Sequence, residues 1–168
     1  MHRMLDVGCG TLRGGRHAIK YLNEGNYYGI DISPKAIAYA KQFVQQEGLS
    51  EKNPHLVVSE KMNLKFREFS GEIFDYILAR SVFTHLKPEH IREYFEYIGD
   101  IMHENSVFYF TYTEGEAYGQ IGRKGFCYPF SFFESLAEEF GLKLKGCSKE
   151  YNHPRGQLMV EVKKNQVN

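Results

Sequence analysis

The stretch Met4–Ser33 constrains the fold of this chain more than any other part of its sequence. It begins with a short apolar run that suits a buried parallel strand, and Gly8 and Gly10 then allow a sharp turn that a ligand can approach closely. A helix over about 13–24 and a second strand ending at Asp31 complete the unit. The first N–H groups of such a helix face the crevice in which nucleotides bind. The stretch therefore predicts one nucleotide-binding half of an α/β fold.

The spacing within this unit bears on which nucleotide it would bind. Asp31 follows Gly8 by 23 residues, the distance at which a carboxylate meets ribose hydroxyls in such units. The dinucleotide fingerprint G-x-G-x-x-G needs a third glycine where this chain has Arg13. The Tyr-x-x-x-Lys pair of short-chain oxidoreductases is missing from the sequence as well. An NAD-dependent oxidoreductase is therefore a distant alternative.

The glycine loop resembles the first motif of the class I S-adenosylmethionine-dependent methyltransferases. In that family an acid precedes the loop, as in Asp6-Val7-Gly8-Cys9-Gly10, and a second acid closes the next strand, as in Gly29-Ile30-Asp31-Ile32. The family often has a further glycine where this chain has Leu12. The resemblance implies a doubly wound, Rossmann-like α/β fold with a mostly parallel seven-stranded sheet and an antiparallel C-terminal strand. It also implies S-adenosylmethionine as the cofactor.

The resemblance assigns roles to five residues of this unit. Gly8 and Gly10 would let the backbone approach the cofactor, and Asp31 would accept hydrogen bonds from two ribose hydroxyls. Asp6 would either face the methionyl amino end of the cofactor or only brace the glycine turn. Arg13 would either pair with the cofactor carboxylate or lie on the surface.

Further cofactor contacts are expected on both sides of the crevice. Ile32 would lie either in the core or against the adenine, and Glu60 and Met62 are the positions that match the adenine-binding loop of the family. Ala79 and Arg80 end the predicted fourth strand and would contact the cofactor through their backbone.

Helices and strands alternate along the rest of the chain. The sequence predicts a helix opened by Ser33-Pro34 and ending before Gly48, strands over 55–59, 73–79 and 106–112, and a helix from Pro88. It also predicts a long loop over 113–128 that is functional or mobile, a helix with a capping box at Ser131-Phe132-Phe133-Glu134 that ends at Gly141, and a closing antiparallel hairpin with strands over 142–149 and 157–163.

The acceptor side of the site is less defined by the sequence. The segment after the fourth strand, 81–86, is also typical of the methyltransferase family, and it contains His85. A neutral imidazole there can take a proton from an acceptor near pH 7, although a histidine that only braces the loop is an equally open interpretation. His85 and His90 have no supporting cluster of metal ligands, so no metal is predicted.

Aromatic and basic residues elsewhere are candidates for acceptor binding. His153 and Arg155, in the turn of the closing hairpin, would either bind an anionic acceptor or be ordinary loop residues. Four tyrosines would line an acceptor pocket, or are there by chance in a chain with 12 tyrosines: Tyr112, Tyr118, Tyr128 and Tyr151.

Size and composition limit the remaining possibilities. The 168 residues, 42% hydrophobic, predict a single domain over 1–168. The 21 Lys and Arg residues balance 21 Asp and Glu without a basic run, so nucleic acid is not an expected partner. No stretch of about 18 apolar residues is present, so a membrane is not an expected partner either. Three cysteines without metal-type spacing favour a reducing, cytoplasmic compartment. The expected acceptor is a small molecule, and the oligomeric state stays open.

The chain enters its first strand almost at once, whereas methyltransferases of this kind usually carry covering helices before it. We therefore expect a methyltransferase core domain without N-terminal lid helices. A cofactor-binding regulatory module or subunit without catalysis is the alternative.

Overall fold

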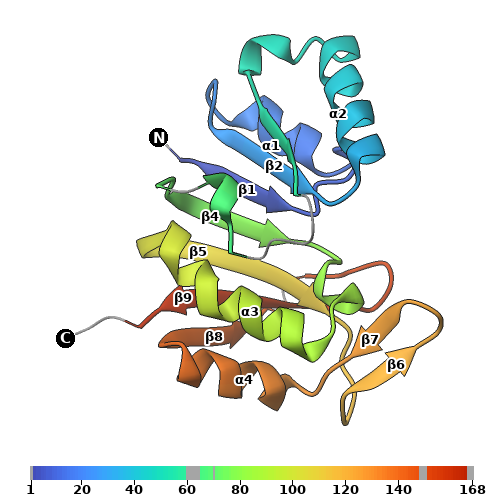
Figure 1. Cartoon of the computed structure of the whole chain (residues 1–168), viewed down its shortest axis with the longest axis vertical. Coiled ribbons are helices and arrows are strands. Elements are labelled where there is room, and N and C mark those ends of the chain that lie inside the picture. The colour runs from blue at the N-terminus through green and yellow to red at the C-terminus, as the bar shows by residue number, and fades with distance from the viewer. Residues whose placement is uncertain (1, 60–64, 70, 148–150, 166–168) are drawn as a thin grey trace.

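The computed structural model describes residues 2–59, 65–69, 71–147 and 151–165, and its elements follow one another as the sequence pattern predicts, with helices between strands (Figure 1). The elements are β1 (Met4–Val7), α1 (Gly15–Tyr21), β2 (Tyr27–Asp31), α2 (Pro34–Gln46), β3 (His55–Val58), β4 (Phe74–Ala79), α3 (Pro88–Ile98), β5 (Met102–Tyr112), β6 (Gly119–Ile121), β7 (Gly125–Cys127), α4 (Phe130–Glu139), β8 (Leu142–Gly146) and β9 (Leu158–Lys164), with short 3₁₀ helices at Ser50–Lys52, Arg67–Phe69, Phe83–His85 and Gly99–Ile101.

Within the described residues the central sheet has seven strands in the order β3-β2-β1-β4-β5-β9-β8. Strands β1 to β5 run parallel, and β9 runs antiparallel to both of its neighbours. This arrangement confirms the predicted fold class. The strand order reverses between β1 and β4, and the carboxyl ends that flank such a switch point are where ligands bind in open α/β sheets.

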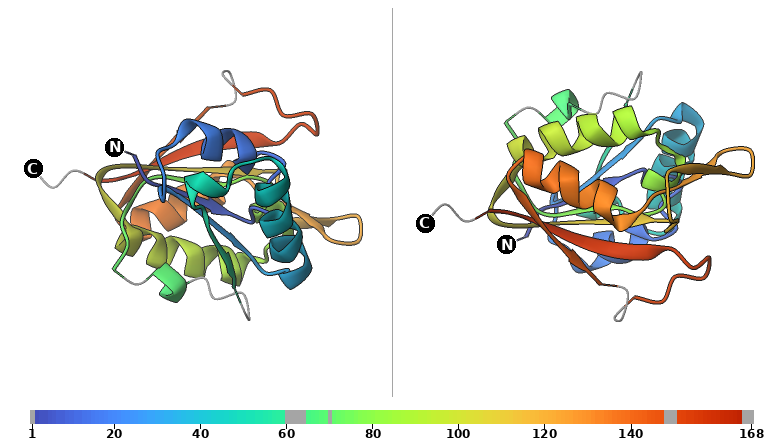
Figure 2. Two further views of the ribbon diagram at one scale, coloured as in Figure 1. Left: turned by 90° about the horizontal axis from the view of Figure 1, so that it is seen from above. Right: turned by 90° about the horizontal axis from the view of Figure 1, so that it is seen from below.

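The two faces of the sheet are covered by different helices (Figure 2). Leu5 and Val7 of β1 belong to the core on the side of α3 and α4. The opposite face of β1 and β2 packs against α1 and α2, with Tyr27 in that second core. Because successive side chains of a strand point to opposite faces, Asp6 lies on the same side as Tyr27. This alternation sets the position of Asp6 behind the glycine turn.

Aromatic packing fixes the α3 and α4 side next to the crevice. Phe83, just past β4, stacks on Phe110 of β5 with ring centroids 4.5 Å apart, and Phe133 of α4 lies 4.9 Å from Phe110. All three side chains are fully buried. The segment that follows β4 is therefore held in place by the core.

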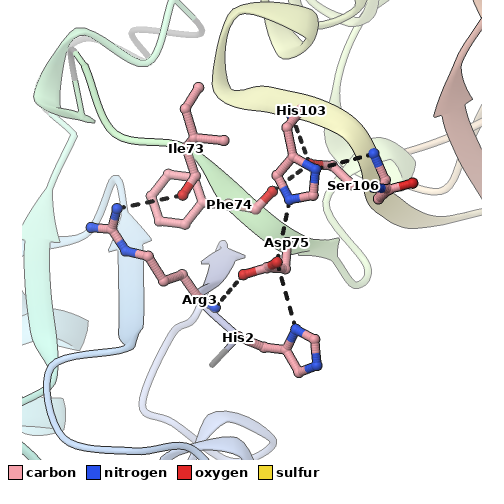
Figure 3. Close-up of polar contacts among 8 residues, drawn as sticks. His2, Arg3, Ile73, Phe74, Asp75, His103 and Ser106 are labelled. Atoms are coloured by element: carbon pink, nitrogen blue, oxygen red, sulfur yellow. Dashed lines mark hydrogen bonds and ion pairs between the residues drawn. The ribbon is translucent and has the colours of Figure 1, made fainter.

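A polar cluster ties the N-terminus to the amino end of the sheet (Figure 3). One oxygen of the Asp75 carboxylate accepts a hydrogen bond from the backbone N–H of Arg3 at 2.6 Å, and the other lies 3.2 Å from Nε2 of His103 and 3.5 Å from Nδ1 of His2. The carboxylate within the apolar strand β4 is thus satisfied at the edge opposite the crevice.

Several predicted element boundaries differ from the structure. The segment 113–128, predicted as a loop, contains the hairpin of β6 and β7, whose turn includes Gly122 at φ +61°. Helix α1 begins only at Gly15, since Leu12 adopts a left-handed φ of +62° that interrupts helical backbone. The predicted capping box at 131–134 is wrong, because the N-cap of α4 is Pro129, two residues before Ser131.

Other local predictions made from the sequence are confirmed by the structure. Ser33 caps α2, its hydroxyl accepting from the Ala36 N–H at 3.2 Å, and Pro34 stands at the first helical position. Gly141 follows α4 at φ +66°, and β8 and β9 form the predicted antiparallel hairpin. In the described part of the chain, no helix combines the length and the apolarity needed to cross a membrane.

Candidate functional site

The glycine loop after β1 requires backbone conformations that few residues adopt. Gly8 has φ +70° and Gly10 has φ +54°. A Cβ on Gly8 would lie 2.6 Å from Cγ2 of Val82, which belongs to the loop on the other side of the crevice. The N–H groups of Gly8 and Cys9 both donate to the Ile30 carbonyl, so the loop is held against the end of β2. Glycine at position 8 is therefore required both by backbone conformation and by space.

Leu12 occupies a backbone conformation that glycine would favour, with φ +62°. Its side chain is fully buried in the core beside α1 and α2. A left-handed backbone at a leucine is unfavourable by about 1 kcal/mol or more, so burial of the side chain must offset it.

Asp31 is fixed at the carboxyl end of β2 by two backbone groups. One carboxylate oxygen accepts from the Gly10 N–H at 2.9 Å, and the other accepts from the Ser33 N–H at 2.8 Å. Each carboxylate oxygen has a second acceptor site free for a further donor. Asp31 also lines the pocket described below, which makes it the best placed carboxylate for a ligand.

Asp6 lies behind the glycine loop, with only 7% of its surface exposed, and accepts a hydrogen bond from the Tyr27 hydroxyl at 2.7 Å. Burial raises the pKa of Asp6 to about 6, against the lowering effect of the Tyr27 hydrogen bond. The negative charge of Asp31 raises this pKa further, and Arg80 lowers it. The carboxylate of Asp6 is thus held by Tyr27 of β2, and both roles expected of Asp6 stay predictions.

A pocket of about 320 Å³ opens at the carboxyl ends of the parallel strands. It is lined by Val7, Gly8, Ile30, Asp31, Ile32, Ser59, Phe66, Arg80, Ser81, Val82, His85 and Leu86. Five residues predicted from the sequence are thus brought together: Gly8, Asp31, Ile32, Arg80 and His85. Ile32 is 60% exposed, so its interpretation as a core residue is wrong.

The other predicted cofactor residues are placed differently. Gly10 contacts Asp31 through its N–H, Ala79 is fully buried at the end of β4, and Arg13 is exposed and does not belong to the lining of the pocket. Glu60 and Met62 lie outside the described residues.

Ser59 and Phe66 are lining residues that the sequence did not indicate. Ser59 follows β3, and its N–H donates to the Asp31 carbonyl at 2.9 Å, so the pairing of β2 and β3 brings it to the pocket. The predicted order of the parallel strands could have indicated Ser59, because the carboxyl ends of neighbouring parallel strands meet at one edge of the sheet.

A buried polar network beyond the pocket was also not predicted. Ser81 lines the pocket at φ +58°, and its N–H donates to Oγ1 of Thr111 at 2.7 Å. The hydroxyls of Ser81 and Thr111 both donate to Oε1 of Gln157, at 3.0 and 2.7 Å. The network ties the end of β4 to the segment that enters β9.

His85 lies at the mouth of the pocket, exposed, in the 3₁₀ helix Phe83–His85. Its Nδ1 is 2.8 Å from the carbonyl oxygen of Lys124, in the turn between β6 and β7. A carbonyl only accepts, so Nδ1 carries the proton and Nε2 of the neutral ring keeps its lone pair. This geometry suits a proton acceptor at Nε2.

The tyrosines expected around an acceptor do not form the pocket wall. None of the four belongs to the described residues that line the pocket. Tyr112 and Tyr128 are buried, and the Tyr128 hydroxyl donates to the Leu86 carbonyl, so that it supports the pocket from behind. Among the residues that the structure describes, no three His, Cys, Asp or Glu side chains are grouped to hold a metal ion.

Comparison with known proteins extends this description. A curated relative, the probable methyltransferase ltbC of Aspergillus luteorubrus, is 30% identical over 88 residues, which cover 51% of this chain and 30% of that protein. This chain therefore spans about a third of the length of the relative it matches.

Solved structures with the same fold are similar over nearly the whole chain. An S-adenosylmethionine-dependent methyltransferase from Clostridium acetobutylicum has a TM-score of 0.73 and 13% identity, covering 98% of this chain and 84% of its own. Magnesium protoporphyrin IX methyltransferase from Synechocystis, with bound S-adenosylmethionine, has a TM-score of 0.73 and 15% identity, covering 98% of this chain and 70% of its own. A profile of the methyltransferase domain family matches residues 5–108, and the chain therefore belongs to that family, as the glycine loop predicted.

Proposed function

We propose that this protein binds S-adenosylmethionine in the pocket at the carboxyl ends of β1, β2 and β4 and transfers its methyl group to a small-molecule acceptor. The observation that carries the proposal is the convergence of Gly8, Asp31 and His85 on one pocket. Membership of the methyltransferase domain family supports it. The structurally similar Synechocystis enzyme is named for a small-molecule substrate, which favours the same class of acceptor here.

The residues of the pocket fit the cofactor. Gly8 and Val82 both line the pocket, and a Cβ on Gly8 would collide with Val82. Only glycine therefore leaves this space open to the cofactor. Asp31 has acceptor capacity left for ribose hydroxyls, and Ile32 and Phe66 offer apolar surface to a flat base. Glu60 and Met62, which lie outside the described residues, remain the proposed adenine contacts by the family motif alone.

The cofactor supplies an activated methyl group on a sulfonium with a good leaving group, so the protein has mainly to position the two reactants. Asp6 places a negative charge behind the loop, which favours the positively charged methionyl end. The backbone at Ala79 and Arg80, at the end of β4, is the proposed opposite wall, and Arg13 remains a proposed partner of the cofactor carboxylate.

His85 is the proposed catalytic residue. The hydrogen bond of Nδ1 to Lys124 leaves Nε2 free to take the proton that the acceptor loses. His85→Gln should lower the rate of methyl transfer by about 100-fold or more while the affinity for the cofactor stays the same. Equal losses in rate and in cofactor affinity would show that His85 is a structural residue.

Calorimetry on the purified chain tests the proposal directly. We expect S-adenosylmethionine and S-adenosylhomocysteine to bind with micromolar affinity and NAD not to bind. Methyl-labelled cofactor incubated with a panel of phenols, carboxylic acids and amines then tests transfer. Tight cofactor binding without transfer to any acceptor would favour a non-catalytic cofactor-binding module, and no binding of either sulfur compound would contradict the proposal.

A further inference from the structure

Two arginines, Arg80 and Arg155, lie close enough to His153 for their charges to lower its pKa. Arg80 lines the pocket, and His153 and Arg155 come from the turn before β9. No ion pair joins either arginine to an acid within the described residues, although the charge of Arg80 lowers the pKa of Asp6. The cluster therefore has unused capacity to donate hydrogen bonds to an anion.

The turn that carries His153 and Arg155 is anchored at the pocket. Gln157, two residues further on, is 94% buried and accepts from the hydroxyls of Ser81 and Thr111. Ser81 lines the pocket next to Arg80 in sequence. The Gly156 N–H also donates to the His153 carbonyl at 2.9 Å, which closes the turn. These contacts hold the turn 153–156, which leads into β9 at the carboxyl edge of the parallel strands.

The state of His153 follows from its contacts. The ring is 7% exposed, and its Nδ1 accepts a hydrogen bond from the Arg155 N–H at 3.2 Å. Burial and the charges of Arg80 and Arg155 hold the pKa of His153 below its usual value. The ring is therefore neutral near pH 7, with its proton on Nε2, where it is a hydrogen-bond donor.

An unpartnered hydroxyl lies close to the same residues. The Tyr151 ring is 5.8 Å from the ring of His153, centroid to centroid. Its hydroxyl oxygen is buried and has no hydrogen-bond partner in the described structure. Buried polar groups are nearly always hydrogen-bonded, so this hydroxyl indicates that a further group completes the region.

We propose that the methyl acceptor carries an anionic group, a carboxylate or a phosphate, that is bound by the guanidinium groups of Arg80 and Arg155 and by Nε2–H of His153. The proposal rests on the proposed function, because it places this group beside the cofactor pocket. Guanidinium groups suit both anions, since their paired N–H donors match two oxygens at once. The net charge of the acceptor would then help to select it over neutral compounds of similar shape.

The test uses the two simplest anions as probes. The chain is saturated with S-adenosylhomocysteine, and the ring signals of His153 are followed by NMR during titration with inorganic phosphate or acetate at constant ionic strength. We expect a saturable shift that sodium chloride does not cause. Stronger binding of phosphate would indicate a phosphorylated acceptor, and stronger binding of acetate a carboxylic acid.

Three variants make the test specific. Arg155→Gln should weaken the anion response about tenfold, as expected for the loss of one charge-assisted hydrogen bond. Arg123→Gln, an exposed arginine in the turn between β6 and β7, is the matched control and should respond as the unmodified chain does. Arg155→Lys keeps the charge and should recover part of the response.

The outcomes separate the two proposals. Normal binding of S-adenosylhomocysteine without a saturable anion response, or with an equal response in Arg155→Gln, would overturn the anionic acceptor alone. Loss of S-adenosylhomocysteine affinity in Arg155→Gln that matches the loss of anion response would assign the cluster to the cofactor and also overturn it. Failure of the unmodified chain to bind S-adenosylhomocysteine would contradict the proposed function itself.

Discussion

Gly8 shows how a single residue determines the shape of the site. Its φ of +70° is unfavourable for any residue with a side chain, and a Cβ would lie 2.6 Å from Val82. Gly48 has a similar φ of +66° but nothing within 4 Å of its Cβ position. A comparison of the two glycines therefore separates backbone strain from the steric clash with Val82. Gly8→Ala and Gly48→Ala should each lower the free energy of unfolding by about 1–2 kcal/mol through backbone strain.

Only Gly8→Ala should also abolish binding of S-adenosylhomocysteine, because only there does the new methyl group displace the wall of the pocket. Urea unfolding and calorimetry on the two variants would measure both effects. Equal cofactor affinity in the two variants would mean that the cofactor does not approach Gly8.

Asp6 should make the stability of the free protein depend on pH. Its pKa rises from 3.8 to about 6 in the folded state, so the folded state favours the protonated form of this carboxyl group. The stability that this preference contributes is complete below pH 3.8 and is lost as the pH rises through 6. Asp6→Asn mimics the protonated form, and it should raise the free energy of unfolding by about 2–3 kcal/mol at pH 8 and not at pH 3. A difference between variant and parent that is the same at both pH values would contradict this account.

The residues of the site differ in how far the sequence could reveal them. Gly8 and Asp31 were predictable, because local backbone geometry and strand order fix their place. The neighbours Ser59, Phe66 and Ser81 were not, because their place depends on how strands distant in sequence align. The left-handed backbone of Leu12 was hidden for another reason, since a leucine gives no local signal for a positive φ.

At the level of elements, two serines with similar sequence signals behave differently. Ser33 precedes a proline and caps α2 through its hydroxyl, whereas Ser131 lies within α4, after the N-cap Pro129. Ser33→Ala should therefore lower the free energy of unfolding by about 1 kcal/mol. Ser131→Ala should change it by less than about 0.5 kcal/mol, because no cap is lost there. Urea unfolding of both variants checks this, and equal effects would mean that the hydroxyl of Ser33 does not stabilise α2.

The hairpin of β6 and β7 shows why an element can escape prediction. Its strands are three residues each, and glycines fill much of 115–125, so local propensity favours a loop. The hairpin is defined by pairs such as Gln120 with Phe126 and by the packing of Tyr118 on Phe126, with ring centroids 5.7 Å apart. Its turn supplies the carbonyl that orients His85. The prediction that this segment is functional therefore stays open, while its predicted lack of regular structure is wrong.

For the whole molecule, the sequence predicted the architecture well because two kinds of signal agree. Buried parallel strands appear as apolar runs, and each is followed by a helix with its own start and stop residues. The same fold is shared with solved structures at 13–15% identity, so the fold depends on the pattern of apolar and turn residues more than on particular side chains.

Cofactor binding should stabilise this whole domain, because the pocket is built from the ends of several strands that separate on unfolding. S-adenosylhomocysteine at 100 times its dissociation constant should add about 2.7 kcal/mol and raise the melting temperature by about 5–10 °C. Asp31→Ala removes two charge-assisted hydrogen bonds and should weaken cofactor binding by about 2–4 kcal/mol, so the same concentration should shift its melting temperature by less than about 3 °C. The ligand-induced shift is the quantity to compare, because Asp31 also holds Gly10 and Ser33 and its loss lowers the starting melting temperature. An equal shift in parent and variant would place the nucleotide away from the end of β2.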